Sequence, residues 1–175
     1  MNWEHAVYAL LFFLPAGIAN MTPIFVSRWP LLKNWRTPLD FGKSYRGKRI
    51  LGPNKTVRGL VCGVIAGTAT GLLLHDPFFS DESTLGFALL CAAISFGALV
   101  GDAAESFFKR QRGIPSGTSW FPFDQTDYII GGLLFTIPFG ILPLWLVLWV
   151  FGLYFGLHLL SSFIGYMVGL KERPI

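Results

Sequence analysis

A stripe of polar side chains follows an apolar stretch in the second half of the chain. Asp102, Glu105, Ser106 and Lys109 are spaced at i, i+3, i+4 and i+7, so they share one face of a helix. Asp102 comes directly after the apolar segment 85–101, at a depth where an unpaired carboxylate is costly and an ionisable residue is a functional candidate. An i, i+4 ion pair accounts for Glu105 and Lys109 but leaves Asp102 unexplained.

Two more carboxylates, Asp124 and Asp127, open the next apolar segment. Taken alone, carboxylates three residues apart at a helix amino terminus are typical of a helix cap. Taken with Asp102, they offer the hard oxygen ligands that Mg²⁺ prefers. The nearby cations Lys109, Arg110 and Arg112 suit phosphate groups. Carboxylates converging beside cations in this way are typical of metal-assisted phosphoryl transfer.

The segment between these carboxylates, 113–119, is rich in glycine and hydroxyl residues. Its backbone N–H groups, those near Gly117 among them, could contact an anion, and Gln125 is a further candidate for substrate binding. The segment is not a P-loop, because Gly-x-x-x-x-Gly-Lys-Ser/Thr is absent.

A second basic element precedes the apolar segment that begins near residue 60. Lys55, Thr56 and Arg58 stand at a predicted helix amino terminus, which suits phosphate binding, although a basic membrane anchor after a turn has the same pattern. Asn20 lies between Pro15 and Pro23 in the first apolar stretch. Its amide either bonds to a neighbouring helix or belongs to the polar site.

The elements that carry these residues are predicted to be membrane helices. The chain has 175 residues, 53% hydrophobic and 14% charged, whereas soluble domains carry about a quarter charged residues. We therefore expect a single all-α integral membrane domain over 1–175, with Cys62 and Cys91 as small core residues. A proline, Pro143, divides the last apolar stretch into two of the five expected spans. These spans are 6–26, 59–75, 85–108, 125–142 and 144–170, with cytoplasmic loops 28–58 and 109–124.

The charges predict how these spans are oriented. Nine of the fourteen Lys and Arg residues lie between Arg28 and Arg58, three between Lys109 and Arg112, and two in the tail, Lys171 and Arg173. With five spans, all fourteen fall on one side. The positive-inside rule then places the amino terminus outside, the carboxy terminus in the cytoplasm, and the candidate site on the cytoplasmic side of the cell membrane. Part of the basic loop is expected to fold back on the membrane face.

These motifs together resemble the CTP-dependent phosphatidate cytidylyltransferase superfamily, and in particular its archaeal branch, the CDP-archaeol synthases. The family's Pro-x-Lys-Thr-x-x-Gly element is matched at 53–59, and its first-helix pattern by Pro15, Ala16 and Asn20. Bacterial and eukaryotic members have a different sequence where this chain has 123–127, and this difference and the five spans favour the archaeal branch. The superfamily signature is matched by Gly101, Asp102, Ser106, Lys109, Arg110, Gly113, Gly117, Pro122, Asp124 and Asp127.

The resemblance implies a Mg²⁺-dependent cytidylyltransferase that joins CTP to 2,3-di-O-geranylgeranyl-sn-glycerol 1-phosphate, forming a CDP-archaeol-type lipid and pyrophosphate. It implies that Asp102, Asp124 and Asp127 hold Mg²⁺ and that Lys109 acts beside them. The implied partners are CTP, an isoprenoid glycerol phosphate lipid and the membrane, and no nucleic acid. The residues expected to bind substrate are Asn20, Lys55, Thr56, Arg58, Glu105, Ser106, Arg110, Arg112, Gly117 and Gln125.

Three other activities remain alternatives. A CDP-alcohol phosphotransferase also uses aspartates and cytidine nucleotides, but its Asp-Gly-x-x-Ala-Arg run is absent around Asp102. A CDP-diacylglycerol synthase of the bacterial type would differ in its lipid. A small transporter would use Asp102 and Asn20 in a polar pathway, and the inverted halves with broken helices that would favour it are not found in the sequence.

Overall fold

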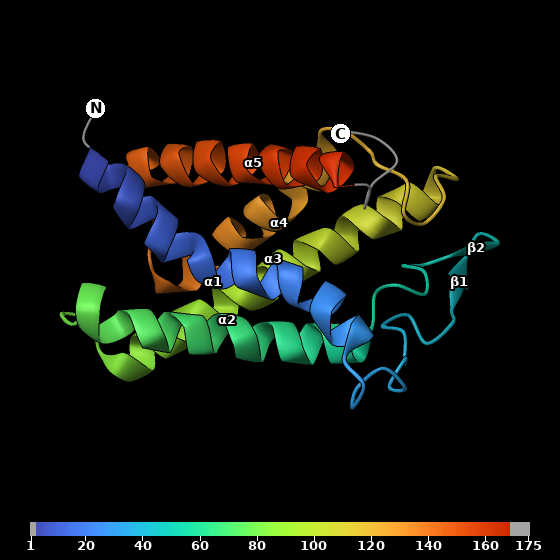
Figure 1. Cartoon of the computed structure of the whole chain (residues 1–175), viewed down its shortest axis with the longest axis horizontal. Coiled ribbons are helices and arrows are strands. Elements are labelled where there is room, and N and C mark those ends of the chain that lie inside the picture. The colour runs from blue at the N-terminus through green and yellow to red at the C-terminus, as the bar shows by residue number, and fades with distance from the viewer. Residues whose placement is uncertain (1–2, 169–175) are drawn as a thin grey trace.

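The computed structural model describes residues 3–168, which form a bundle of helices with a small hairpin at one end (Figure 1). The two short strands of the hairpin pair antiparallel, with Ser44 opposite Arg49. The elements are α1 (Trp3–Arg28), β1 (Ser44–Tyr45), β2 (Lys48–Arg49), α2 (Val57–Phe78), α3 (Thr84–Gln111), α4 (Phe123–Leu134), the 3-10 turn η1 (Ile137–Phe139) and α5 (Leu144–Met167).

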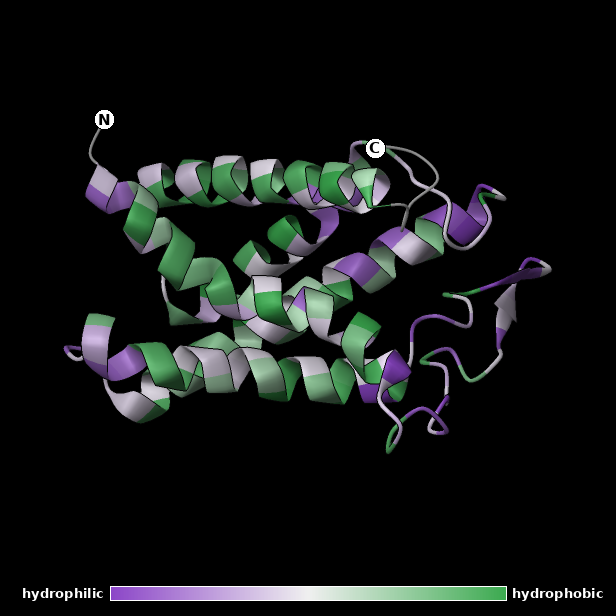
Figure 2. Ribbon diagram, in the orientation of Figure 1, coloured by the Kyte–Doolittle hydropathy of each residue, from purple (hydrophilic) through white to green (hydrophobic). Residues whose placement is uncertain are grey.

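Four of these helices, α1, α2, α3 and α5, are long and apolar enough to cross a membrane. The shortest, α2, has 22 residues and is about 33 Å long, which matches the hydrocarbon thickness of a bilayer. Large apolar side chains such as Leu73, Leu85 and Leu148 are exposed on the outside of the bundle, and Figure 2 shows the hydrophobic residues along these helices. The prediction of a helical membrane protein is confirmed. Residues 169–170 of the last predicted span and the basic tail lie outside the described residues.

The fourth predicted span, 125–142, is not one continuous helix. Helix α4 has 12 residues, about 18 Å, and ends at Leu134. Pro138 has no N–H to donate to the carbonyl oxygen of Leu134, the chain continues only as the 3-10 turn η1, and Gly140 has a φ of 139°. The chain still returns to the end of the bundle where α1 begins. There the ring of Trp145 stacks on that of His5, with ring centroids 4.3 Å apart. Helix α5 starts directly after Pro143, as predicted.

Small residues let the helices pack closely. Gly63, Gly67 and Gly71 recur every four residues on α2, facing α1 and α3. A Cβ added at Gly67 would lie 2.6 Å from the carbonyl oxygen of Pro15, and one added at Gly63 would lie 2.8 Å from Leu99 Cδ1. The two cysteines are free thiols; Cys91 is buried in the core and Cys62 is half-buried.

Helices α3 and α4 make the closest approach. A Cβ at Gly131 would lie 2.8 Å from the Cα of Gly101, and a Cβ at Gly101 would collide with the carbonyl oxygen of Asp127. Only glycine allows this contact. This contact places Asp102, the residue after Gly101, beside the amino-terminal half of α4.

Candidate active site

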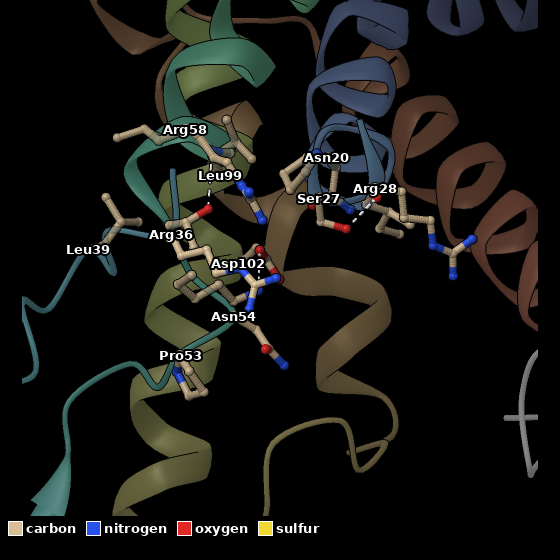
Figure 3. A pocket seen from close by; sticks show the side chains of 16 residues that line it. Asn20, Ser27, Arg28, Arg36, Leu39, Pro53, Asn54, Arg58, Leu99 and Asp102 are labelled. Atoms are coloured by element: carbon tan, nitrogen blue, oxygen red, sulfur yellow. Dashed lines mark hydrogen bonds and ion pairs between the residues drawn. The ribbon is translucent and has the colours of Figure 1, made fainter. Parts of the chain in front are cut away.

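One end of the bundle gathers most of the residues that the sequence singled out. Helices α1 and α3 end there, α2 and α4 begin there, and the 29–56 loop covers them (Figure 1). A cavity of about 740 Å³ opens between α1, the loop, α2 and α3, as Figure 3 shows. Asn20, Lys55, Thr56, Arg58 and Asp102 all line it. Asn20 thus lies at the wall of this cavity, and its role in binding substrate stays a prediction.

Lys55 and Asp102 form an ion pair across this cavity, with Lys55 Nζ donating to Asp102 Oδ2. The two residues are 47 positions apart in the chain, and the pair brings the loop before α2 against the carboxy-terminal third of α3. About a quarter of each side chain is exposed, so both remain accessible from the cavity. The structure thus joins the two motifs that the sequence placed in one site only through the family resemblance.

Asp127 lies close to Asp102, because the backbone of Gly101 packs against the carbonyl group of Asp127. Its Oδ1 accepts a hydrogen bond from the backbone N–H of Tyr128 at 2.6 Å. Among residues 3–168, no Lys or Arg forms an ion pair with Asp127. Lys55 therefore pairs with Asp102, whereas the neighbouring Asp127 has no basic ion-pair partner within the described residues.

Lys109 is buried between two other carboxylates. Its Nζ lies 2.8 Å from Asp124 Oδ1 and 3.3 Å from Glu105 Oε1. The second oxygen of Asp124, Oδ2, accepts from the backbone N–H of Trp120 at 2.8 Å. Asp124 thus orders the turn into α4 and compensates the charge of Lys109. The capping role that the spacing also allowed is not found for Asp124: the N-cap residue of α4 is Pro122, without a side-chain cap hydrogen bond, and Asp124 accepts from Trp120, ahead of the helix.

The comparisons with known proteins agree with this geometry. The family model for CarS-like CDP-archaeol synthase matches residues 4–175. A CDP-archaeol synthase of Thermococcus onnurineus is 34% identical, with 99% of each chain covered, and one of Methanospirillum hungatei is 37% identical, covering 78% of this chain and 89% of its own. A solved structure described as an intramembrane enzyme for archaeal membrane lipid biosynthesis has a TM-score of 0.76 and 34% identity, covering 89% of this chain and 93% of that one. This chain belongs to the CDP-archaeol synthase family.

Two other predicted substrate residues, Thr56 and Arg58, have structural partners in this CDP-archaeol synthase family member. Thr56 caps α2, its hydroxyl accepting from the N–H of Gly59 at 3.3 Å. Arg58 is buried and donates to the carbonyl oxygen of Leu32 at 2.6 Å. Ser106 and Gln125 are buried in α3 and α4. Thr56 and Arg58 border the cavity, whereas Ser106 and Gln125 do not line it, and the buried Gln125 Oε1 has no hydrogen-bond partner within the described residues.

The remaining candidates lie at the carboxy-terminal end of α3 or in the loop that follows it, outside the cavity. Arg112 stacks over the ring of Trp120 at 4.9 Å, and Gly117 sits at a φ of 87° in the 113–119 segment. The Nε of Arg110 is buried and lacks a hydrogen-bond partner within the described part of the chain. None of the three lines the cavity. The structure therefore does not bring them against Asp102 in the way it brings Lys55.

The expected metal ligands do not all converge in this arrangement. Within residues 3–168, no group of three or more metal-ligating side chains is close enough to form a cluster. Asp102 and Asp127 still fit a divalent cation, because they are hard-oxygen ligands where α3 and α4 touch, and the one basic side chain paired with either of them within residues 3–168 is Lys55, on Asp102. Asp124 has both oxygens engaged, by Lys109 and by Trp120, so it fits such a role only if Lys109 is released.

Sequence reasoning missed several residues of the site. Arg28 and Arg36 line the cavity, although they were counted only as determinants of membrane orientation. Asn54 also lines it, and its amide donates to Ser116 Oγ at 2.9 Å, which ties the loop to the 113–119 segment. Lys48 donates to the carbonyl oxygen of Gln111 at 2.6 Å. These two contacts hold the basic loop against the carboxy-terminal end of α3 and the segment that follows it, and its return to the membrane face stays a prediction.

Proposed function

We propose that this family member transfers a cytidylyl group from CTP to the phosphate of an isoprenoid glycerol phosphate lipid, 2,3-di-O-geranylgeranyl-sn-glycerol 1-phosphate. The observation that carries the proposal is the Lys55 to Asp102 pair, which stands in a cavity at the end of four apolar helices. Basic side chains and a carboxylate there meet apolar ones such as Ile24 and Leu60. A cavity of this kind suits a substrate with an anionic head and apolar tails.

The reaction needs positioning and charge neutralisation more than proton transfer. An oxygen of the lipid phosphate attacks the α-phosphorus of CTP, and the bond from that phosphorus to the oxygen bridging the α- and β-phosphates breaks. Pyrophosphate leaves with the bonding electrons. The attacking phosphate is already anionic, so no general base is required. Lys55, Arg28 and Arg36 supply positive charge around the cavity and hold the phosphates in line.

Mg²⁺ would be held by Asp102 and Asp127. When bound, it neutralises the charge that builds up on the phosphates as the bond breaks. Lys55 would then be free to turn from Asp102 toward a phosphate, since the metal would compensate that carboxylate. Asp124 and Lys109 remain paired in this scheme and keep the start of α4 in place.

The lipid tails would lie along the outside of α1. Met21, Ile24 and Phe25 are exposed on this helix, and Ile24 also lines the cavity. The headgroup can therefore reach the cavity while the tails stay in the bilayer. This path makes the cavity a meeting point for one water-soluble and one membrane-bound substrate.

The function is tested with the purified protein, labelled CTP and a panel of lipid phosphates. We expect the isoprenoid glycerol phosphate to be converted to a CDP-lipid, with one pyrophosphate released for each product formed. Preference for a diacylglycerol phosphate would favour the bacterial-type activity. Release of CMP from a CDP-lipid in the presence of an alcohol would favour a CDP-alcohol phosphotransferase, and flux into liposomes without nucleotide consumption a transporter.

We propose that the site faces the cytoplasm, as the basic loops predict. In a background with Cys62→Ala and Cys91→Ala, Ser80→Cys should react with an impermeant thiol reagent added to intact cells. Ser80 lies between α2 and α3, at the end of the bundle opposite the site. Ser44→Cys, in the hairpin beside the site, should react only after the cells are opened. The reverse labelling pattern would place the site on the opposite side of the membrane from cytoplasmic CTP. It would therefore contradict this orientation.

Lys55→Ala should lower kcat/KM for CTP by roughly 10- to 150-fold. This range corresponds to about 1.5–3 kcal/mol, the usual contribution of a hydrogen bond to a charged group. The measurement is steady-state kinetics with CTP varied at saturating lipid phosphate. Lys33→Ala is the matched control, because Lys33 is an exposed lysine of the same basic loop.

Two results would remove Lys55 from the nucleotide site. If Lys55→Ala and Lys33→Ala have equally small effects, Lys55 is only one of several basic residues near the membrane surface. If Lys55→Ala changes the Mg²⁺ requirement but not the KM for CTP, Lys55 serves only to compensate Asp102.

A further inference from the structure

Asp40 is a buried carboxylate that the reaction described above does not use. Its side chain is fully buried, although it lies in the 29–56 loop outside the helix bundle. Arg49 donates to it twice, from Nη2 to Oδ1 at 2.7 Å and from Nε to Oδ2 at 3.2 Å. Three backbone N–H groups, those of Gly42, Leu51 and Gly52, donate to it at 3.0 Å each.

These contacts control the segment that carries Lys55. Asp40 Oδ2 accepts from the backbone N–H of Gly52. Leu39, the residue before Asp40, donates its N–H to the carbonyl oxygen of Lys55 at 2.8 Å. Both ends of the segment 52–55 are therefore tied to residues 39–40. Gly52 has a φ of 96°, a conformation that a residue with a side chain rarely adopts, so the turn into this segment is sharp.

The same contacts do not hold the bundle together. Within residues 3–168, every hydrogen bond to the Asp40 carboxylate comes from residues 42–52, and none comes from a helix. Burial alone would raise the pKa of Asp40, but the Arg49 guanidinium and the three backbone donors lower it well below its usual range. Asp40 therefore stays ionised and keeps these partners throughout the physiological pH range.

We propose that Asp40 and Arg49 form a positioning pair, which fixes the 52–55 segment so that Lys55 faces Asp102. The pair touches no substrate and acts through Lys55 and Asn54, whose side chains line the cavity. What Lys55 does to a substrate rests on the proposed function, whereas the placement of Lys55 by this pair does not.

A double-mutant cycle tests the activity side of the proposal. Asp40→Asn keeps the shape of the side chain but turns an N–H₂ group toward one of the donors, so the segment loses part of its anchor. We expect kcat/KM for CTP to fall by ~10- to 100-fold, the scale for misplaced catalytic groups. The double variant Asp40→Asn/Lys55→Ala should be little worse than Lys55→Ala alone. Arg49→Lys, which keeps the charge but loses the two-pronged contact, should fall between the parent and Asp40→Asn.

A second readout does not depend on activity. Acylation of the Lys55 amine, followed by mass spectrometry, should be slow in the parent protein and at least ~10-fold faster in Asp40→Asn, because a displaced Lys55 no longer pairs with Asp102. The thermal midpoint of the helix bundle should stay within a few degrees of the parent value. Asp81→Asn, at an exposed carboxylate between α2 and α3, is the control for both readouts.

The outcomes separate this proposal from the proposed function. Unchanged Lys55 acylation in Asp40→Asn overturns the positioning role, whatever the enzyme makes. The role is also overturned if the activity losses of Asp40→Asn and Lys55→Ala multiply in the double variant. A fall in the thermal midpoint of the bundle large enough to account for the lost activity overturns it as well. Faster acylation in a protein that makes no CDP-lipid would support the positioning pair and refute the proposed function.

Discussion

Asp102→Asn should lower turnover by at least ~100-fold, the scale for removing a principal electrostatic group from a site of this kind. Asp102 is the point at which the two motifs meet, because it pairs with Lys55 and neighbours Asp127. An amide at this position keeps the size of the side chain but removes the charge that balances Lys55 and that would bind Mg²⁺. The measurement is single-turnover conversion of CTP and lipid phosphate to product.

Asp81→Asn provides the matched control for Asp102→Asn. It makes the same chemical change at an exposed carboxylate between α2 and α3, where we expect normal turnover. Helical content by circular dichroism should be unchanged in both variants, because the hydrogen bonds of α3 do not depend on the Asp102 side chain. Near-normal turnover of Asp102→Asn would show that Asp102 has only a structural role.

Removal of divalent cations with EDTA should reduce activity to background, and added Mg²⁺ should restore it. The reason is electrostatic: Lys55 pairs with Asp102 and not with Asp127, and a triphosphate adds several more negative charges to the same cavity. The measurement is product formation at fixed CTP over a series of free Mg²⁺ concentrations. Full activity in the chelator would refute the metal assignment.

Two variants refine the test of the metal site. Asp127→Asn should raise the Mg²⁺ concentration needed for half-maximal activity by at least ~10-fold, as expected when a metal site is weakened. Asp124→Asn should have the smaller effect on that concentration, because Asp124 is held by Lys109 and Trp120. The opposite order would mean that Asp124 leaves Lys109 and is itself a principal ligand.

The sequence predicted the helical membrane fold, because the length of an apolar stretch and the distribution of basic residues directly reflect the bilayer. It was less informative where the backbone departs from a regular helix. The part of this predicted span from 128 to 142 is almost entirely apolar, yet the helix ends at Leu134. The sequence has Pro138 and Gly140 just after the point where the helix ends, but a hydropathy profile alone does not detect such a break.

Within the site, residue type was easier to predict than side-chain direction. The spacing of Asp124 and Asp127 fits both a cap and a metal ligand, and only the fold shows that Asp124 is held by Lys109 and the turn before α4. Arg36 looked like one of many loop cations until the cavity formed around it. No sequence pattern singled out Asp40, because its hydrogen-bond partners lie in a loop without hydrophobic periodicity.

The most direct test of the account follows the fate of each phosphate of CTP. Purified protein is incubated with the isoprenoid glycerol phosphate, Mg²⁺ and CTP labelled at either the α- or the γ-phosphorus, with Asp102→Asn run in parallel. The account predicts that the α-label moves into the lipid fraction, that the γ-label leaves as pyrophosphate in equal amount, and that the variant does neither. Release of the γ-label as inorganic phosphate, or an α-label that never enters lipid, would contradict a cytidylyl transfer at this site.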